Sequence, residues 1–241
     1  ARTVPVAARG LASPMLLVGY AALTFIALWA IVGINVGTVK ADMFYKQGLA
    51  YDNSGQWPGS VGPYNRAISL APSEDFYYLF LGRAYMEWAK NRSQFDAVLG
   101  AGQNPPAPTL LQLSEQALLR AKALNPMNTD HYANLGRLYS WWGSSDGGGD
   151  AAKISLAVQA YETAHQLSPG NAQIWNELGL AYYKAGRYQD AIDALHGSIA
   201  MDDRYALSYF VLGEIQRSES VARQAQDPAA AARLAAEAAD A

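Results

Sequence analysis

The pattern that decides the fold lies within residues 175–195. Residues 175–182 read Trp-Asn-Glu-Leu-Gly-Leu-Ala-Tyr, residues 185–188 read Ala-Gly-Arg-Tyr, and residues 191–195 read Ala-Ile-Asp-Ala-Leu. An aromatic residue, a Leu-Gly pair and a tyrosine lie on a first helix, a glycine marks the turn, and alanines lie on a second helix. Small residues let two antiparallel helices approach closely, so this stretch predicts a helix-turn-helix unit.

The Leu-Gly pair of this unit recurs along the chain, each time beside aromatic residues. The marking glycines, the first preceded by Gln in place of Leu, are Gly48, Gly82, Gly136, Gly179 and Gly213. Their separations are 34, 54, 43 and 34 residues. The two longer separations contain residues 92–110 and 143–150, whose glycines, prolines and serines are typical of loops. Five in-phase units with two loop insertions therefore extend over residues 40–241.

The spacing and the residue types resemble the tetratricopeptide repeat (TPR), whose period is 34 residues. The resemblance implies an all-α fold, a right-handed α-solenoid of about five helix-turn-helix repeats that bury their apolar faces against one another. We expect both insertions to be dispensable for folding, because long surface loops are tolerated. We expect the second helix of the first repeat to be short and to begin near Pro63. The alanine-rich residues 227–241 predict a final helix.

An uncharged stretch precedes the repeats. No residue between Arg9 and Lys40 is charged, and residues 15–34 are almost entirely apolar. About 20 such residues cross a bilayer as a helix. The sequence therefore predicts an N-terminal segment over residues 1–10, a transmembrane helix over residues 11–39 and the TPR solenoid from residue 40. A secretory signal peptide is the competing interpretation, although its apolar part is usually shorter.

The charges around this stretch indicate an orientation. Arg2 and Arg9 precede it, whereas Lys40 and Lys46 follow it with Asp42 between them. The positive-inside rule then favours a cytoplasmic N-terminus and an extracytoplasmic solenoid. Only residues 38–40 separate the apolar run from the first repeat, so we expect the solenoid to begin at the membrane surface.

Two glycines in the apolar stretch have the spacing of a helix-packing motif. Gly33 and Gly37 are four residues apart, a small-xxx-small spacing that lets another membrane helix approach closely. Chance is the alternative explanation in a span that contains several glycines.

Composition and motifs argue against several functions. The chain of 241 residues has 18 Lys and Arg against 21 Asp and Glu, which gives no basic field for a nucleic acid. It has no cysteine and three histidines. His165 and His196 could form a ligand pair or be two surface histidines, and a metal needs three or four ligands. The sequence contains no catalytic or nucleotide-binding motif, so we predict no enzyme activity, metal or cofactor.

The surface of the solenoid is where the sequence predicts function. The TPR resemblance implies that the first helices line a concave, partner-binding groove. The alternative is that some of the side chains expected in this groove pack inside the solenoid. The residues expected in the groove are Tyr45, Leu49, Leu79, Arg83, Met86, Arg137, Trp141, Asn176, Leu180, Tyr183, Lys184 and Phe210.

The chain resembles single-span TPR proteins of the bacterial envelope. That resemblance implies a scaffold in the bacterial cytoplasmic membrane, an accessory or assembly subunit of a larger complex, whose partners are membrane protein subunits or their peptide segments and the lipid bilayer. Residues 40–48 and 71–85 also resemble the TPR tail of bacterial O-antigen ligase-like proteins. The alternative is therefore a fragment or derived relative of such a glycopolymer enzyme, and a Met codon directly before Ala1 would favour the small scaffold.

Overall fold

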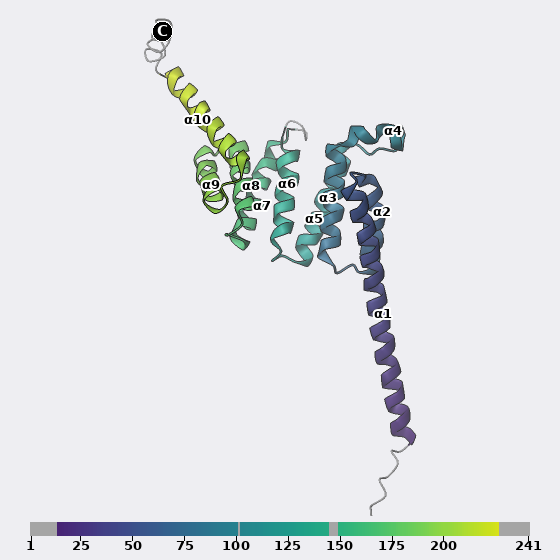
Figure 1. Cartoon of the computed structure of the whole chain (residues 1–241). Helices are drawn as coiled ribbons and strands as arrows, with labels where there is room; N and C mark the ends of the chain where they lie inside the picture. Colours follow the sequence, from purple (N-terminus) through teal and green to yellow (C-terminus); the bar gives the residue numbers. More distant parts are fainter. Residues whose placement is uncertain (1–13, 101, 145–148, 227–241) are drawn as a thin grey trace, which may run out of the picture.

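The computed structural model describes residues 14–100, 102–144 and 149–226, and these form helices without any strand (Figure 1). The elements are α1 Pro14–Asn53, α2 Trp57–Leu70, α3 Asp75–Lys90, the 3₁₀ turn η1 Arg92–Phe95, α4 Asp96–Leu99, α5 Ala107–Leu124, α6 Thr129–Trp142, α7 Ala151–Leu167, α8 Ala172–Lys184, α9 Tyr188–Met201 and α10 Ala206–Gln226. The expected all-α fold is confirmed. The expected segment 1–10 and final helix over 227–241 lie outside the described residues.

The helices stack as consecutive antiparallel pairs. The pairs are α1 with α2, α3 with α5, α6 with α7, and α8 with α9, and α10 follows as the first helix of a fifth unit. Figure 1 shows the stack running from α2 to α9, with α1 leaving it as a long rod at one end and α10 at the other. This arrangement is an α-solenoid, in which each unit contacts its neighbours.

The marking glycines explain why the paired helices lie so close. A Cβ atom on the glycine would lie under 3.0 Å from a side chain of the second helix in each of four units. The pairs are Gly48 with Tyr64, Gly82 with Leu118, Gly136 with Tyr161, and Gly179 with Leu195. A large residue of the second helix therefore occupies the space that any side chain on the first helix would need.

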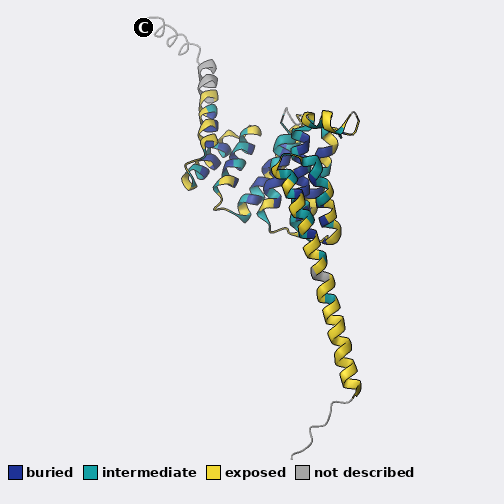
Figure 2. Cartoon of the chain, turned by 45° about the vertical axis from the view of Figure 1, so that its right-hand side comes forward, coloured by how far each residue is buried: buried dark blue, intermediate teal, exposed yellow. Residues whose placement is uncertain are grey.

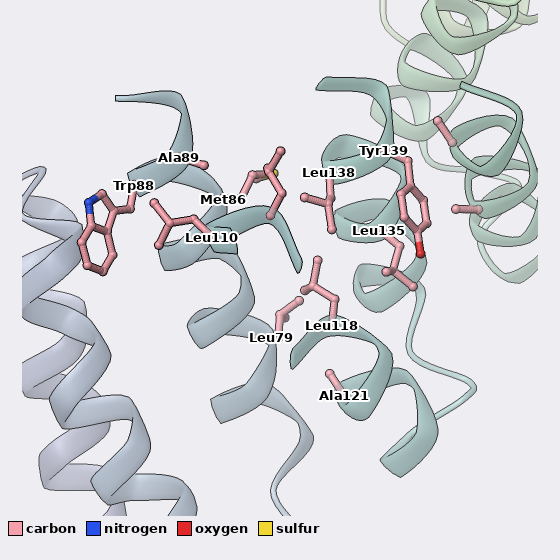
Figure 3. Close-up of a cluster of buried hydrophobic side chains, with 13 residues drawn as sticks. Leu79, Met86, Trp88, Ala89, Leu110, Leu118, Ala121, Leu135, Leu138 and Tyr139 are labelled. Atoms are coloured by element: carbon pink, nitrogen blue, oxygen red, sulfur yellow. The ribbon is translucent and has the colours of Figure 1, made fainter. Parts of the chain in front are cut away.

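The largest apolar cluster joins the second and third units. Leu79 of α3 and Leu118 of α5 point toward each other, and Leu135 and Leu138 of α6 meet them from the next unit (Figure 3). All four are buried. The burial of such side chains is the main source of stability in a solenoid, because one unit cannot bury its apolar face alone.

Helix α1 continues from the apolar stretch into the first repeat without a break. It has 40 residues, and its 18-residue window of mean hydropathy 2.3 is wholly unburied (Figure 2). By length and composition this helix could cross a membrane, although a signal sequence passes the same test. Residues 38–40, expected as a short connection, are helical, so the two parts of α1 form one rod.

The second helix of the first repeat begins earlier than expected. Helix α2 starts at Trp57, with Pro58 in its first turn and Pro63 in its interior, so the predicted start near Pro63 is wrong. The first turn is docked on α1, because the ring of Tyr51 packs against Gly59. The first turn of a helix tolerates Pro58 because a backbone N–H at that position would have no intrahelical partner to lose.

The first insertion is more ordered than its composition indicates. Residues 92–99 form η1 and α4, and α5 begins at Ala107, so the last residues of the 92–110 interval are helical. Asn104 is buried and accepts a hydrogen bond from Trp88 Nε1 at 3.0 Å. Its amide donates to the Arg92 carbonyl and to Asp96, each at 2.8 Å. These contacts tie the insertion to α3.

The second insertion is described only at its edges. Asp150 caps α7 by accepting a hydrogen bond from the Ala152 amide at 3.0 Å, a typical N-cap contact. Residues 145–148 lie outside the described part.

Candidate protein-binding groove

A groove of about 660 Å³ runs across the first helices of three successive units. Its lining residues recur at intervals of three and four along α3, α6 and α8, which places them on one face of each helix. They are Arg83, Met86, Glu87 and Lys90 of α3, Asn134, Arg137, Ser140 and Trp141 of α6, Tyr161 of α7, Gln173, Glu177, Leu180 and Lys184 of α8, and Leu207 of α10.

The groove has a surplus of positive charge. It is lined by four cationic and two anionic side chains. Lys90 pairs with Glu87 at 2.8 Å. Arg83 is exposed, has no ion-pair partner within the described residues, and lies over the Phe80 ring at 5.1 Å. A carboxylate of a partner would therefore meet an available guanidinium at Arg83.

A hydrogen-bonded ion pair forms the floor between α6 and α8. Arg137 donates from Nε and Nη2 to Glu177 Oε1, at 2.9 and 2.7 Å. Gln173 donates to the same oxygen at 3.0 Å. Burial opposes the charge of Arg137, but Glu177 outweighs it and raises the pKa of the guanidinium. This pair stays charged and fixes the spacing of the two helices.

Tyr161 lies beneath this ion pair. Burial, followed by the negative charge of Glu177, raises the pKa of the Tyr161 hydroxyl well above its ordinary value. The hydroxyl therefore remains a neutral donor at the base of the groove.

Apolar side chains lie between the charges. Met86 is buried, Trp141 and Leu180 are half-buried, and Leu207 is 49% exposed. Such a surface suits a segment that has both apolar and acidic side chains.

Six of the twelve residues predicted for the groove line it: Arg83, Met86, Arg137, Trp141, Leu180 and Lys184. The Lys184 ammonium lies 3.4 Å from the Ser140 carbonyl, which links α8 to α6 at the rim.

The other predicted residues lie elsewhere. Tyr45 packs in an aromatic cluster, with ring centroids 5.1 Å from Phe76 and 5.2 Å from Phe80. Leu79 is buried in the core. Asn176 is buried and accepts a hydrogen bond from the Ser208 hydroxyl at 2.7 Å.

Two more lie near the C-terminal end. Tyr183 is half-buried against Tyr188, at 5.9 Å between ring centroids, and Phe210 is 63% exposed on α10. Half-buried Leu49 does not line the groove.

Sequence reasoning missed several lining residues. They are Glu87, Lys90, Asn134, Ser140, Tyr161, Gln173, Glu177 and Leu207. Most lie three or four residues from a predicted position on the same helix face, so extending each face by one turn would have found them. Tyr161 belongs to a second helix and had no such signal.

The two glycines of the apolar stretch differ in their surroundings. No atom lies within 4 Å of a Cβ built on Gly33, whereas one built on Gly37 lies 3.8 Å from the Leu70 carbonyl oxygen. Gly37 therefore faces the end of α2 of its own chain.

The described residues contain no group of three or more His, Asp or Glu side chains placed to hold a metal ion. His165 packs on Trp175 at 4.1 Å between ring centroids, and His196 is exposed.

A stack of antiparallel helix pairs with a groove over its first helices defines an α-solenoid scaffold. Sequence models of the tetratricopeptide repeat match residues 153–186 and 172–205. These residues cover α7 to α9, so the chain contains TPR units of the type that mediates protein–protein interaction.

Solved structures share the fold. The thermophilic TPR protein TTC0263 of Thermus thermophilus matches with a TM-score of 0.52 at 16% identity, over 78% of this chain and 92% of that one. MamA from Desulfovibrio magneticus RS-1 (41-end) matches with a TM-score of 0.51 at 16% identity, over 69% and 77%. At these identities the likeness concerns the fold.

One curated protein is similar in sequence. The BBSome complex member bbs-4 of Caenorhabditis elegans is 21% identical over 200 residues. The match covers 73% of this chain and 41% of that protein, so the chain spans less than half the length of its relative.

Proposed function

We propose that the protein is a membrane-anchored TPR scaffold that holds a segment of a neighbouring membrane protein. The observation that carries the proposal is the groove, which combines a positive surplus with apolar side chains on the first helices of the solenoid. Its role is binding, since Glu87 and Glu177 are paired with Lys90 and Arg137, the tyrosine is neutral, and the exposed Arg83 is left to meet a partner.

The chemistry of the groove favours an amphipathic acidic segment. Acidic side chains would pair with Arg83 and the rim lysines, and apolar side chains would cover Trp141 and Leu207. Amphipathic helices that dock into grooves place their apolar face inward in this way.

The continuity of α1 supports a partner close to the bilayer. If the apolar part of α1 spans the bilayer, no flexible linker separates it from the first repeat. The solenoid could then meet only segments near the membrane surface. We infer an accessory or assembly subunit of a larger complex in the bacterial cytoplasmic membrane, with the solenoid on the extracytoplasmic side. The charge asymmetry around the apolar stretch supports this orientation.

The glycines suggest a further contact within the membrane. Gly33 is open on the surface of α1 and would let a partner helix approach. Replacing Gly33 with leucine tests this contact cleanly, whereas a change at Gly37 would also disturb Leu70.

Photo-crosslinking in native membranes tests the groove. A crosslinking amino acid at Leu207 should capture a protein, and the additional change Arg83→Glu should reduce that product at least fivefold. The same amino acid at Leu119, exposed on the second-helix face, serves as the control position. Arg120→Glu, an exposed charge on that face, is the matched charge control. Equal products at both positions would contradict the proposal.

Alkaline carbonate extraction tests the anchor separately. The chain should remain in the membrane pellet, and release into the supernatant would contradict anchoring without bearing on the groove. The resemblance to O-antigen ligase-like tails adds no second function, because its residues Phe44 and Phe76 pack against the apolar cluster of Ala41, Ala67, Ala71 and Tyr77.

A further inference from the structure

A second cavity lies between α1 and α2, next to the apolar stretch. Its volume is about 480 Å³. Helix α1 contributes Lys40, Met43, Phe44 and Gln47, and α2 contributes Arg66, Ser69 and Leu70. It is separate from the groove and shares no lining residue with it.

The position of this cavity along α1 is fixed by the helix. Lys40 is the first charged residue after the apolar stretch. The end of α2 reaches down to Gly37, as the proximity of the Leu70 carbonyl shows. At a rise of about 1.5 Å per residue, Phe44 lies about 6 Å beyond Lys40 and Gln47 about 10 Å. The headgroup layer on each side of a bilayer is roughly 5–7 Å thick. With Lys40 at its inner edge, the layer would reach Phe44, and Gln47 would lie just outside it.

The charge of the cavity is wholly positive. Lys40 and Arg66 line it and no carboxylate does. Neither cation forms an ion pair with any residue that the structure describes, and the Arg66 guanidinium lies over the Phe44 ring at 5.9 Å. The acidic side chain of Asp42 is engaged elsewhere, because it accepts a hydrogen bond from the Tyr77 hydroxyl at 2.8 Å. The cavity therefore offers two uncompensated cations to an anion.

Apolar side chains adjoin these cations on the side of the apolar stretch. Val39 precedes Lys40 and is 59% exposed, and Leu70, at the end of α2 beside Gly37, is 39% exposed. A free phosphate ion would gain nothing from them, whereas the acyl chains of a lipid would cover them.

We propose that this cavity binds an anionic phospholipid, with Lys40 and Arg66 on the phosphate and with Leu70 against the upper acyl chain. The Gln47 amide supplies further hydrogen-bond donors. The site rests on the proposed membrane anchoring, because only a spanning α1 brings the cavity to the headgroup layer. Bound lipid would fix the tilt of the solenoid over the bilayer and so the direction of its groove.

Native mass spectrometry of the full chain tests this site. The chain is reconstituted in vesicles of phosphatidylcholine and phosphatidylglycerol at 3:1 and then released into mild detergent. The wild type should retain phosphatidylglycerol in preference to phosphatidylcholine. The double variant Lys40→Gln/Arg66→Gln should lose retention about tenfold or more, since each cation near an anionic surface contributes substantially.

The control removes two charges outside the cavity. Lys46 is exposed on α1 and Arg120 on α5, and Lys46→Gln/Arg120→Gln should retain phosphatidylglycerol as the wild type does. Equal losses in both double variants would overturn the cavity site in favour of non-specific attraction. Displacement of the lipid by millimolar inorganic phosphate would overturn the lipid as ligand. Flotation with pure phosphatidylcholine vesicles isolates the anchor, so failure to float refutes anchoring, whereas floating chains without lipid preference refute only this site.

Discussion

The ring of Tyr161 packs directly against Gly136, so that a Cβ atom on the glycine would lie 2.6 Å from Tyr161 Cζ. The same relationship joins the two helices of four units, while a Cβ on Gly213 would meet no described atom within 4 Å. Within the described residues, one residue type at one repeat position thus has two different surroundings.

Gly136→Ala should therefore destabilise the protein, and Gly213→Ala should not. The new methyl group in α6 must displace a buried ring, at a cost of about 1–3 kcal/mol that exceeds the helix-propensity gain of up to ~1 kcal/mol. In α10 only the propensity gain remains. Thermal unfolding of the full chain in detergent, followed by circular dichroism at 222 nm, compares the two. Equal midpoints would show that the close approach at Gly136 relaxes freely.

The contact between Asp75 and His131 predicts that the folded protein loses stability in acid. Asp75 Oδ2 lies 2.6 Å from His131 Nε2, which joins the first turns of α3 and α6. Burial alone would raise the pKa of Asp75, but the hydrogen bonds from His131, Asn128 and Asn125 outweigh it and lower that pKa below 3.8. A depressed folded-state pKa stabilises the protein above the unfolded-state value of about 3.9, and this stabilisation is lost as pH falls through the folded value.

Asp75→Asn should therefore cost stability at pH 7 and should lessen the further loss as the pH falls below about 4. Unfolding midpoints from pH 7 to pH 3 measure both effects, with the exposed Asp203→Asn as the control. Parallel pH profiles for the wild type and Asp75→Asn would argue against the role given to this carboxylate.

The ion pair between Arg137 and Glu177 should behave as a unit. Arg137→Gln leaves the Glu177 carboxylate, whose side chain is 15% exposed, without its cation, which should cost about 1–3 kcal/mol. Arg137→Gln/Glu177→Gln should cost less than the sum of the single changes, with a coupling of about 1 kcal/mol. Chemical denaturation of the wild type, the two single variants Arg137→Gln and Glu177→Gln, and the double variant gives the coupling energy. Additive losses would mean that the pair contributes nothing as a pair.

Asn104→Ala should reveal that the first insertion is part of the fold. The change removes three hydrogen bonds and leaves the buried Trp88 N–H unpaired, at a cost of about 1–3 kcal/mol. Gln103→Ala, at an exposed neighbour, should have no effect on the unfolding midpoint. If both variants melt like the wild type, the insertion is dispensable, as its composition alone predicts.

Part of this protein follows from its sequence alone. The recurring glycines predict the helix pairs because only a residue without a side chain fits where the two helices cross so closely, and its position can be read from the sequence. Gly179 and Leu195 lie within one repeat, so their contact depends on a local helix-turn-helix geometry that the 34-residue period encodes. The apolar residues 15–34 likewise predict a long helix from composition.

The tertiary structure decided which of the candidate residues share one surface. Leu49 and Arg83 directly follow the marking glycines of their repeats, yet Leu49 is half-buried away from the groove while Arg83 is exposed and lines it. Asn176 accepts a hydrogen bond from Ser208 of the next unit, 32 residues away. Exposure at such positions depends on the side chains that neighbouring repeats bring together. A repeat pattern specifies its own unit, but the packing between units sets which faces remain open to a partner.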